Sequence, residues 1–288
     1  MTLFLFAVNL YARQTSLSEK QLNEDFAIFE GSIKEAHAGL YWYNDTVSID
    51  GKLSEIKSSI KQDMSQTEFH KHLQEFYAGI NCGHSWMSKP SDFINKRESG
   101  NYYFPFNLFF NEYEARVSKD YTSEQSLNIG AEVIEIDGQT IPSIFKTLYK
   151  FIPSDGFNVT GKNRIIAGQF AEYYQEYIKM NDQVTLLIKE EGSDQTKLIT
   201  INCLSKSTFE EQSKRTKTST EDLLSFKIVD NQTGLLKIKT FSKGWIKYQQ
   251  KVSFKEFIKE VFTEIREKNI TKLILDLRFN GGGDDEFG

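Results

Sequence analysis

The residues with the clearest chemical potential lie close to the end of the 288-residue chain, where an apolar stretch leads into Asp276, Arg278 and three consecutive glycines. Glycines at the end of a strand allow backbone N–H groups to approach a ligand closely, because no Cβ stands in the way. Such amides suit an anion or the negative charge that develops on an oxyanion. We therefore expect Gly281 to Gly283 to form an oxyanion hole or anion cradle, with a flexible turn as the alternative.

The residues around the glycines favour structural roles. Asp276 and Arg278 flank one residue and project from the same face of a strand, so an ion pair between them is expected. The acidic run from Asp284 to Glu286 is typical of a solvated segment, and no metal site is predicted. The glycines match neither the GxGxxG fingerprint nor a phosphate-binding loop, which leaves nucleotide binding as a third and weaker hypothesis.

His84 is the histidine whose sequence context suggests catalysis. It lies in the segment NCGHS, residues 81–85, and a histidine beside Gly and Ser can act as a general base when a local hydrogen bond holds it. A structural or merely exposed histidine is the alternative. His70 and His72 lie two apart on an expected helix and cannot share a metal ion. His37 lies near an expected helix end, where a cap or dipole role is the plain explanation.

Composition narrows the functional classes. The 35 Lys and Arg and the 40 Asp and Glu are interspersed and give a net charge of −5, which argues against nucleic-acid binding. Cys82 and Cys203 lie far apart, so two free thiols are expected, with one bridge as the alternative. Cys82 as a nucleophile has no second supporting feature. No cofactor is predicted.

The first 14 residues are apolar and end in a small and polar stretch. This pattern is typical of the tail of a secretory signal peptide, so we expect export to the periplasm, cell envelope or exterior. A short buried strand is the alternative. No stretch of the chain is long enough to predict a membrane span.

Three amphipathic helices with short connections are expected to form a helical N-terminal domain over residues 15–90. Apolar residues recur at i, i+4, i+7 and i+11 in the first and the third of them. The expected helices cover residues 18–38, residues 51–64, and the stretch from Ser65 or Thr67 to Ile80.

Residues 91–205 combine short strands with two helices, which is typical of an α+β module. The dipeptide Asp137-Gly138 closes one of the strands and is a strong turn signal. The expected strands cover residues 102–110, 112–118, 130–138, 184–189 and 197–202, and the expected helices cover residues 141–151 and 162–179.

Residues 206–222 are polar and are expected to be a linker. The following strand 235–241, helix 252–268 and strand 272–277 predict a βαβ unit with a parallel strand pair. One such unit cannot make a domain, so residues 223–288 are expected to be the start of a larger α/β core. Because its last strand would stay partly uncovered, we expect this part to be poorly stable or prone to aggregation.

These segments together resemble the tail-specific, or C-terminal-processing, serine peptidases, including the tricorn-core branch. Residues 275–283, LDLRFNGGG, resemble the D-x-R-x-N-x-G-G core strand of that family. Residues 82–85, CGHS, resemble its G-H-T/S segment, which follows a helical domain. Residues 129–141 are similar to the strand and turn of a PDZ-like domain. The resemblance extends from about residue 17 onward.

The resemblance implies an α+β multidomain serine peptidase with a helical N-terminal domain, a PDZ-like module and the start of a crotonase-like (ββα-superhelix) core. His84 would be the general base, and Gly281 and Gly282 would donate to the oxyanion formed from a peptide or protein substrate. No serine here matches the family's nucleophile motif. We therefore expect a chain truncated inside its catalytic domain and inactive alone. The alternative is a non-catalytic peptide-binding module that uses the PDZ-like sheet.

Overall fold

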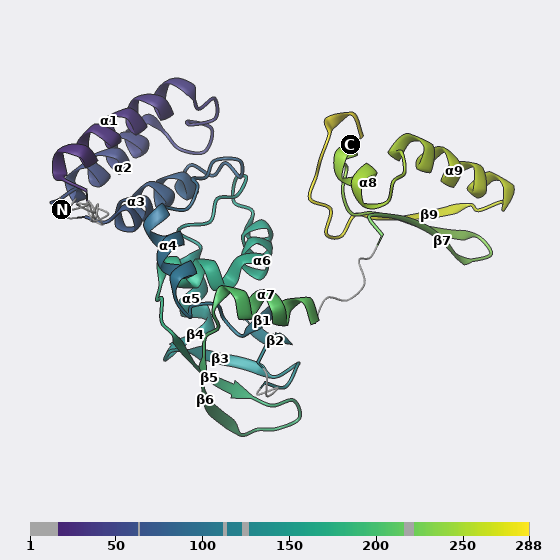
Figure 1. Ribbon diagram of the computed structural model, residues 1–288. Coiled ribbons are helices and arrows are strands. Elements are labelled where there is room, and N and C mark those ends of the chain that lie inside the picture. The colour runs from purple at the N-terminus through teal and green to yellow at the C-terminus, as the bar shows by residue number, and fades with distance from the viewer. Residues whose placement is uncertain (1–16, 63, 112–113, 123–126, 216–221, 288) are drawn as a thin grey trace, which may run out of the picture. The chain divides into compact units, whose positions relative to one another are not determined.

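The computed structural model describes residues 17–62, 64–111, 114–122, 127–215 and 222–287 (Figure 1). The chain divides into two compact units, residues 1–216 and 217–288. The predicted signal-peptide remnant, residues 1–14, lies outside the described residues. The mixture of helices with antiparallel strands confirms the predicted α+β class.

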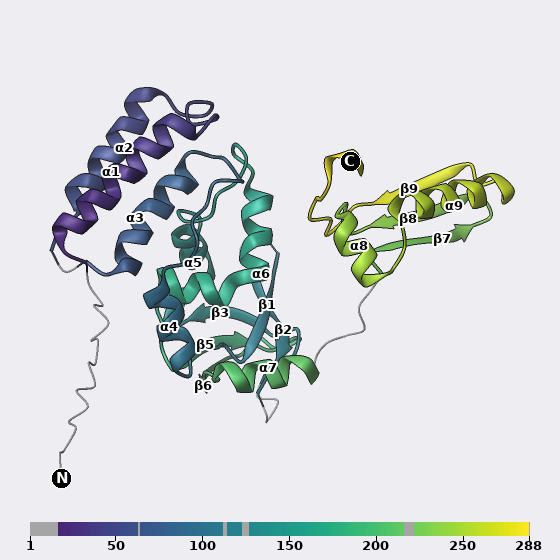
Figure 2. The same cartoon turned by 45° about the horizontal axis from the view of Figure 1, so that its top comes forward.

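The first unit begins with three helices that lie side by side (Figure 2). The helices are α1 (Glu19–Ala36), α2 (Thr46–Ser59) and α3 (Gln66–Gly79). Ser18 and Ser65 cap α1 and α3 with complete capping boxes, which satisfy backbone donors that the helix leaves free. Helix α2 begins five residues earlier than predicted, because the side chain of Asp45 accepts a hydrogen bond from the Ser48 amide and caps it there.

A six-stranded sheet follows within the described residues, and all its strand pairs are antiparallel. The strand order is β1-β2-β3-β5-β6, and β4 pairs with β3. The strands are β1 (Phe106–Asn111), β2 (Glu114–Asp120), β3 (Glu132–Ile136), β4 (Gln139–Thr140), β5 (Gln183–Lys189) and β6 (Thr196–Asn202). The predicted Asp137-Gly138 turn is confirmed. It joins β3 to β4, and the two residues have φ values of 49° and 76°.

Helices α5 (Ile141–Leu148) and α6 (Val159–Tyr177) pack on this sheet. Alternate residues of β5, such as Leu186, are buried against apolar side chains of the two helices. Helix α4 (Ser91–Ser99) was not predicted. It buries one apolar residue, Phe93, and so carries no repeating apolar pattern.

The prediction of a linker over residues 206–222 is wrong for its first ten residues. They form helix α7 (Lys206–Arg215). Phe209 holds the helix in place, because its ring lies 5.4 Å from the ring of Tyr103 and 5.2 Å from that of Tyr121. A single aromatic residue in a polar segment gave no amphipathic period, so the sequence did not reveal the helix.

Buried polar contacts join the three N-terminal helices to the sheet module inside the first unit. Gln74, which is 3 % exposed, donates through Nε2 to the carbonyl of Phe151 at 2.9 Å and accepts from the amide of Met87 at 3.2 Å. Glu176 lies 3.0 Å from His70 and 2.9 Å from the ammonium of Lys89. The predicted boundary at residue 90 therefore lies within one compact unit.

Replacing Gln74 with alanine is expected to lower the free energy of unfolding of the first unit by about 2–4 kcal/mol, because the buried carbonyl of Phe151 and the half-buried amide of Met87 lose their partner and a small cavity remains. Urea unfolding measures the change. Gln66→Ala, which removes an exposed hydrogen bond at the start of the same helix, is the control and should cost less than about 0.5 kcal/mol. Equal costs for the two variants would contradict the bridging role of Gln74.

The second unit contains a three-stranded sheet of order β7-β8-β9. Its elements are β7 (Leu224–Asp230), β8 (Thr233–Ile238), α8 (Lys243–Gln249), α9 (Phe254–Glu267), β9 (Lys272–Asp276) and the short 3₁₀ helix η1 (Asp285–Phe287). Strands β8 and β9 are parallel, which confirms the strand pairing predicted for the βαβ unit. The antiparallel hairpin of β7 with β8 and helix α8 were not predicted.

Strand β9 is less covered than a strand of its composition normally is. Leu273, Ile274 and Leu275 are 41 %, 49 % and 53 % exposed, although apolar strands of parallel sheets are usually buried on both faces. Val261 of α9 is buried with Leu236 and Ile238 of β8 instead. In the described part of the chain, no helix is long and apolar enough to cross a membrane.

Candidate active-site segments

The glycine run lies in a tight turn after β9. Asn280 organises the turn, because its Nδ2 donates to the carbonyl of Ile238 at 3.0 Å and its Oδ1 accepts from the amide of Gly282 at 2.7 Å. The amide of Gly281 donates to the carbonyl of Lys239 at 3.3 Å. Both of the predicted oxyanion donors therefore have internal acceptors in this structure.

The glycines also permit a close approach of two backbone segments. The carbonyl of Gly282 accepts from the amide of Phe241 at 2.8 Å and from Oγ1 of Thr240 at 3.1 Å. At Gly283, which has φ of 152°, a Cβ would lie 2.1 Å from the carbonyl carbon of Phe241. At Gly281 an added Cβ would meet nothing within 4 Å. Glycine is required at position 283 by contact with the protein's own backbone.

The predicted ion pair of Asp276 and Arg278 is confirmed. Oδ1 of Asp276 accepts from Nε of Arg278 at 2.9 Å and from its backbone amide at 3.0 Å, and Oδ2 accepts from Nη2 at 2.8 Å. Asp276 is 7 % exposed, whereas the Arg278 side chain is 80 % exposed. Hydrogen bonds from Arg278 hold the pKa of Asp276 well below its usual range.

This lowered pKa predicts acid sensitivity in the second unit. The contribution of Asp276 is fully present above the ordinary aspartate pKa of about 3.9 and is lost as the pH falls toward the lowered value. We expect Asp276→Asn to flatten the pH dependence of stability below about pH 4, as measured by urea unfolding between pH 5 and pH 2. Asp285→Asn, at an exposed position of η1, is the control. Identical slopes for wild type and Asp276→Asn would contradict this role.

His84 is exposed and lies in a turn of the first unit, in which the amide of Ser85 donates to the carbonyl of Cys82 at 3.1 Å. No hydrogen bond of its ring is found among the described residues. The turn itself is held firmly. Asp155 accepts from the amide of Gly83 at 2.8 Å, and the amide of Gly156 donates to the carbonyl of Asn81 at 2.9 Å.

His37 contributes to the same turn in a way that the sequence did not reveal. Its backbone caps α1 by donating to the carbonyl of Ile33, which confirms the cap role. Its side chain does more, because Nε2 lies 2.6 Å from Oγ of Ser85. Ser85 is only 9 % exposed, which fits a structural hydroxyl. The two residues are 48 positions apart, and no local pattern signals such a pair.

Exposed aromatic side chains lie in the loops that form this turn and its contacts, namely residues 37–43, 81–86 and 155–157. Phe157 is 83 % exposed and its ring lies 6.0 Å from that of Tyr43. Trp42 and Trp86 are 77 % and 64 % exposed. Exposed apolar groups gathered around one loop cluster are typical of a surface that binds a partner or ligand.

The two cysteines and the histidines of α3 show no arrangement that indicates catalysis or metal binding among the described residues. Cys82 and Cys203 are free thiols, as predicted, and burial raises the pKa of Cys203 to about 12, which keeps it protonated and unreactive. No group of three residues able to hold a metal ion is found among the described residues. His70 faces Glu176, whereas His72 lines a different hollow beside Phe76.

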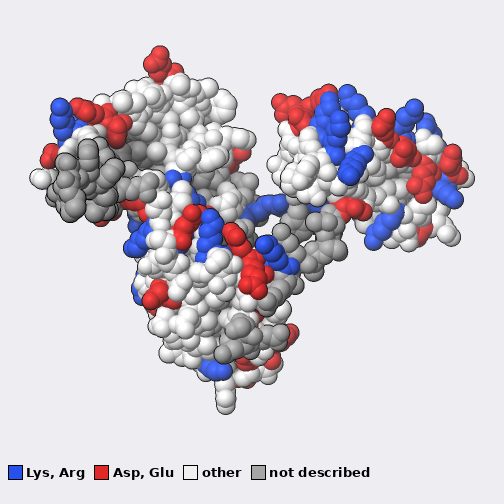
Figure 3. Space-filling model, in the orientation of Figure 1, with Lys and Arg blue, Asp and Glu red and all other residues white. Residues whose placement is uncertain are grey.

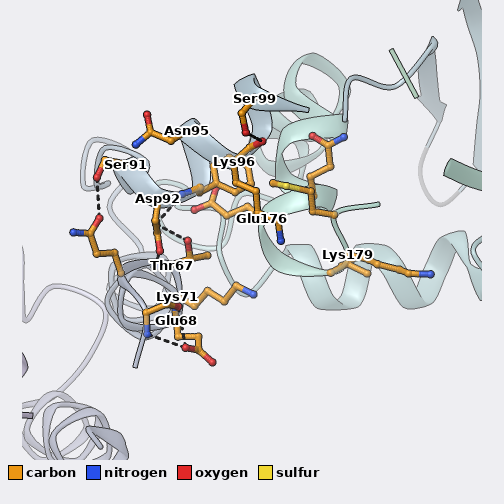
Figure 4. Close-up of a pocket in the computed structure, with 16 residues that line it drawn as sticks. Thr67, Glu68, Lys71, Ser91, Asp92, Asn95, Lys96, Ser99, Glu176 and Lys179 are labelled. Carbon is orange, nitrogen blue, oxygen red and sulfur yellow. Dashed lines mark hydrogen bonds between the residues drawn. The ribbon is translucent and has the colours of Figure 1, made fainter. Parts of the chain in front are cut away.

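A pocket of about 800 Å³ lies between α3, α4 and α6 (Figure 4). The side chain of Lys71 extends across it from α3, and burial lowers the pKa of that ammonium. Three lysines and three carboxylates line the pocket, namely Lys71, Lys96, Lys179, Glu68, Asp92 and Glu176. This balance gives no preference for an ion of either sign. Figure 3 likewise shows basic and acidic side chains interspersed over the visible surface.

A known protein family matches most of the second unit. Residues 232–287 match the family model of peptidase family S41. This segment contains β8, α9, β9 and the glycine turn. No curated protein matches the chain.

Solved structures of CPAF share the fold. The crystal structure of a CPAF S499A mutant has a TM-score of 0.62 and 14 % identity, and the match covers 93 % of this chain and 57 % of that one. Mature CPAF complexed with lactacystin has a TM-score of 0.64 and 13 % identity, and the match covers 93 % of this chain and 58 % of that one. Mature CPAF has a TM-score of 0.61 and 14 % identity, and the match covers 93 % of this chain and 56 % of that one. The chain thus spans just over half of the length of these proteins. The segment match and the shared fold support peptidase family S41.

Proposed function

We propose that this chain is part of a serine-type peptidase of the tail-specific branch, acting on peptide or protein substrates. The observation that carries the proposal is the match of residues 232–287 to peptidase family S41, because this segment ends in the glycine turn. His84 belongs to the first compact unit and the turn to the second. Their meeting in one site is part of the proposal.

In the proposed mechanism His84 accepts the proton of a serine hydroxyl as that oxygen attacks the substrate carbonyl. Its exposed position, on a turn fixed through Gly83 and Ser85, leaves the imidazole accessible to a nucleophile. Backbone amides of the glycine turn stabilise the negative charge that grows on the carbonyl oxygen in the transition state.

The hydrogen bonds that Gly281 and Gly282 make in this structure indicate which amide is the better candidate for an oxyanion donor. Gly282 donates to Asn280 at 2.7 Å, whereas the bond from Gly281 to Lys239 is longer, at 3.3 Å. The longer bond is the easier to share with an oxyanion, so Gly281 is the better supported donor of the two. No serine of this chain matches the nucleophile motif, and we propose that the nucleophile comes from sequence outside these 288 residues.

The finer architecture is proposed on the same resemblance. It comprises a helical domain over residues 15–90, a PDZ-like module over 91–205 and a crotonase-like core that begins near residue 223. Export is proposed from the apolar residues 1–14.

Hydrolysis of a labelled unstructured protein tests the proposal. The 288-residue chain alone should give no hydrolysis above buffer. The product of the reading frame extended beyond the codon for Gly288 should contain a serine in a Gly/Ser-rich nucleophile context and should hydrolyse the protein. An extension that lacks such a serine would refute the peptidase assignment.

A non-catalytic peptide-binding module is the second candidate, favoured by the open edge of the sheet in the first unit. Strand β6 pairs only with β5 within the described residues, and its Leu198 is 69 % exposed. An extended peptide could add to such an edge through main-chain hydrogen bonds. Titration with peptides carrying free and amidated C-termini measures this. Absence of binding would remove the module hypothesis, and equal binding of both forms would remove recognition of the C-terminus.

A further inference from the structure

We propose that a smaller pocket in the first unit, here called the Trp86 pocket, binds the tyrosine side chain of a polypeptide. It lies between α3, the segment 83–89 and α6 and has a volume of about 280 Å³. Gly83 and Trp86 both line it, and His84 lies between them in the chain. The inference rests on the proposed function only in taking the polypeptide to be a substrate.

The dimensions and walls of the pocket suit one aromatic side chain. Its volume lies just below the range of about 300–1,000 Å³ that is typical of sites for whole small molecules. Trp86, Tyr173 and Tyr177 provide aromatic walls, and aromatic rings prefer the offset and edge-to-face contacts that such walls offer. Trp86 is 64 % exposed, so apolar area is available for a bound ring to cover.

His70 supplies a buried polar group to the wall of the pocket. It is 5 % exposed and lines the pocket. Its Nδ1 lies 3.0 Å from Oε1 of Glu176. Both ring nitrogens are shielded from solvent, and neither has a hydrogen-bond partner among the described residues. Nε2 can accept a hydrogen bond when the ring proton is on Nδ1 and can donate one when Nε2 itself carries a proton, and a phenol hydroxyl is able to pair with it in either case. A buried polar atom without a partner is uncommon in folded proteins and favours a ligand whose hydroxyl can pair with it.

The charged neighbours of the pocket argue against an anionic ligand. The ammonium of Lys89 lies 2.9 Å from Glu176 and 3.6 Å from Glu172, and it also sits 4.9 Å from the ring centre of Tyr173. The one lysine that lines the pocket, among the described residues, is therefore already paired. A phenol combines an apolar ring with a hydroxyl donor, whereas phenylalanine would leave Nε2 of His70 unpaired.

Binding of blocked amino acids tests the proposal without any hydrolysis. N-acetyl-tyrosine amide and N-acetyl-phenylalanine amide are titrated against the ¹⁵N-labelled chain, and the histidine ring nitrogens are followed by NMR. We expect the tyrosine compound to bind about tenfold more tightly, as one added hydrogen bond predicts, and to shift the Nε2 signal of His70. Equal affinities, or no movement of that signal, would overturn the proposal.

Three variants complete the test. Trp86→Ala changes an exposed side chain and should weaken both compounds, and His70→Gln should remove the preference for tyrosine. His72→Gln alters the same helix outside this pocket and should change neither.

A blocked Gly-Tyr-Gly peptide should bind at least as well as free tyrosine, and tighter binding of the free amino acid would overturn the assignment to a polypeptide. Loss of the peptidase hypothesis would leave these binding results unaffected.

Discussion

Replacing His84 with alanine is expected to lower kcat of the proposed peptidase by a factor on the order of 10⁵, because removal of a general base disables the whole catalytic group. The substitution should leave stability within about 0.5 kcal/mol of wild type, since the side chain is exposed. Steady-state hydrolysis by the extended polypeptide measures the first effect, and urea unfolding measures the second.

His72→Ala is the matched control for this experiment. His72 is a half-buried histidine of α3 in the same unit, and its loss should change kcat less than about twofold. Retention of full activity by His84→Ala would remove His84 from the mechanism. An equal loss in both variants would point to a structural effect.

Replacing Gly283 with alanine is expected to destabilise the second unit by about 3 kcal/mol. The new methyl group would lie 2.1 Å from the carbonyl carbon of Phe241, and the backbone has φ of 152°, so both overpacking and a strained conformation contribute. Hydrogen exchange measured over residues 233–287 should report the loss as faster opening of β8 and β9.

Gly281→Ala provides the control for this prediction, because a Cβ there meets nothing within 4 Å. It should cost less than about 1 kcal/mol, because the added methyl group meets no other atom within 4 Å. If the two alanine variants open equally fast, the close approach at Gly283 does not hold the turn.

The helices were predictable where the sequence repeats an apolar residue every third or fourth position. In α1, Leu22, Phe26 and Ile33 are buried as that spacing requires. Helix α7 carries one apolar anchor, Phe209, and shows no such period. The start of α2 depended on a cap from Asp45, which is a single-residue signal.

The candidate site was predictable only in part, for a comparable reason. The ion pair of Asp276 with Arg278 is local, and strand alternation sufficed to predict it. The acceptors of the glycine amides include Lys239, about forty residues earlier in the chain. Likewise, Ser85 is paired with His37 across a loop cluster that only the folded chain assembles.

The most direct test of the central claim is a crystal structure of the extended polypeptide with a peptide boronate bound to its nucleophilic serine. The boronate imitates the tetrahedral intermediate, so its oxygens mark the positions of the nucleophile and of the oxyanion. The account predicts the His84 imidazole within 3.2 Å of one oxygen and an amide of the glycine turn within about 3.1 Å of another. A boronate contacted by a different histidine, with Gly281 and Gly282 still bonded internally, would contradict it.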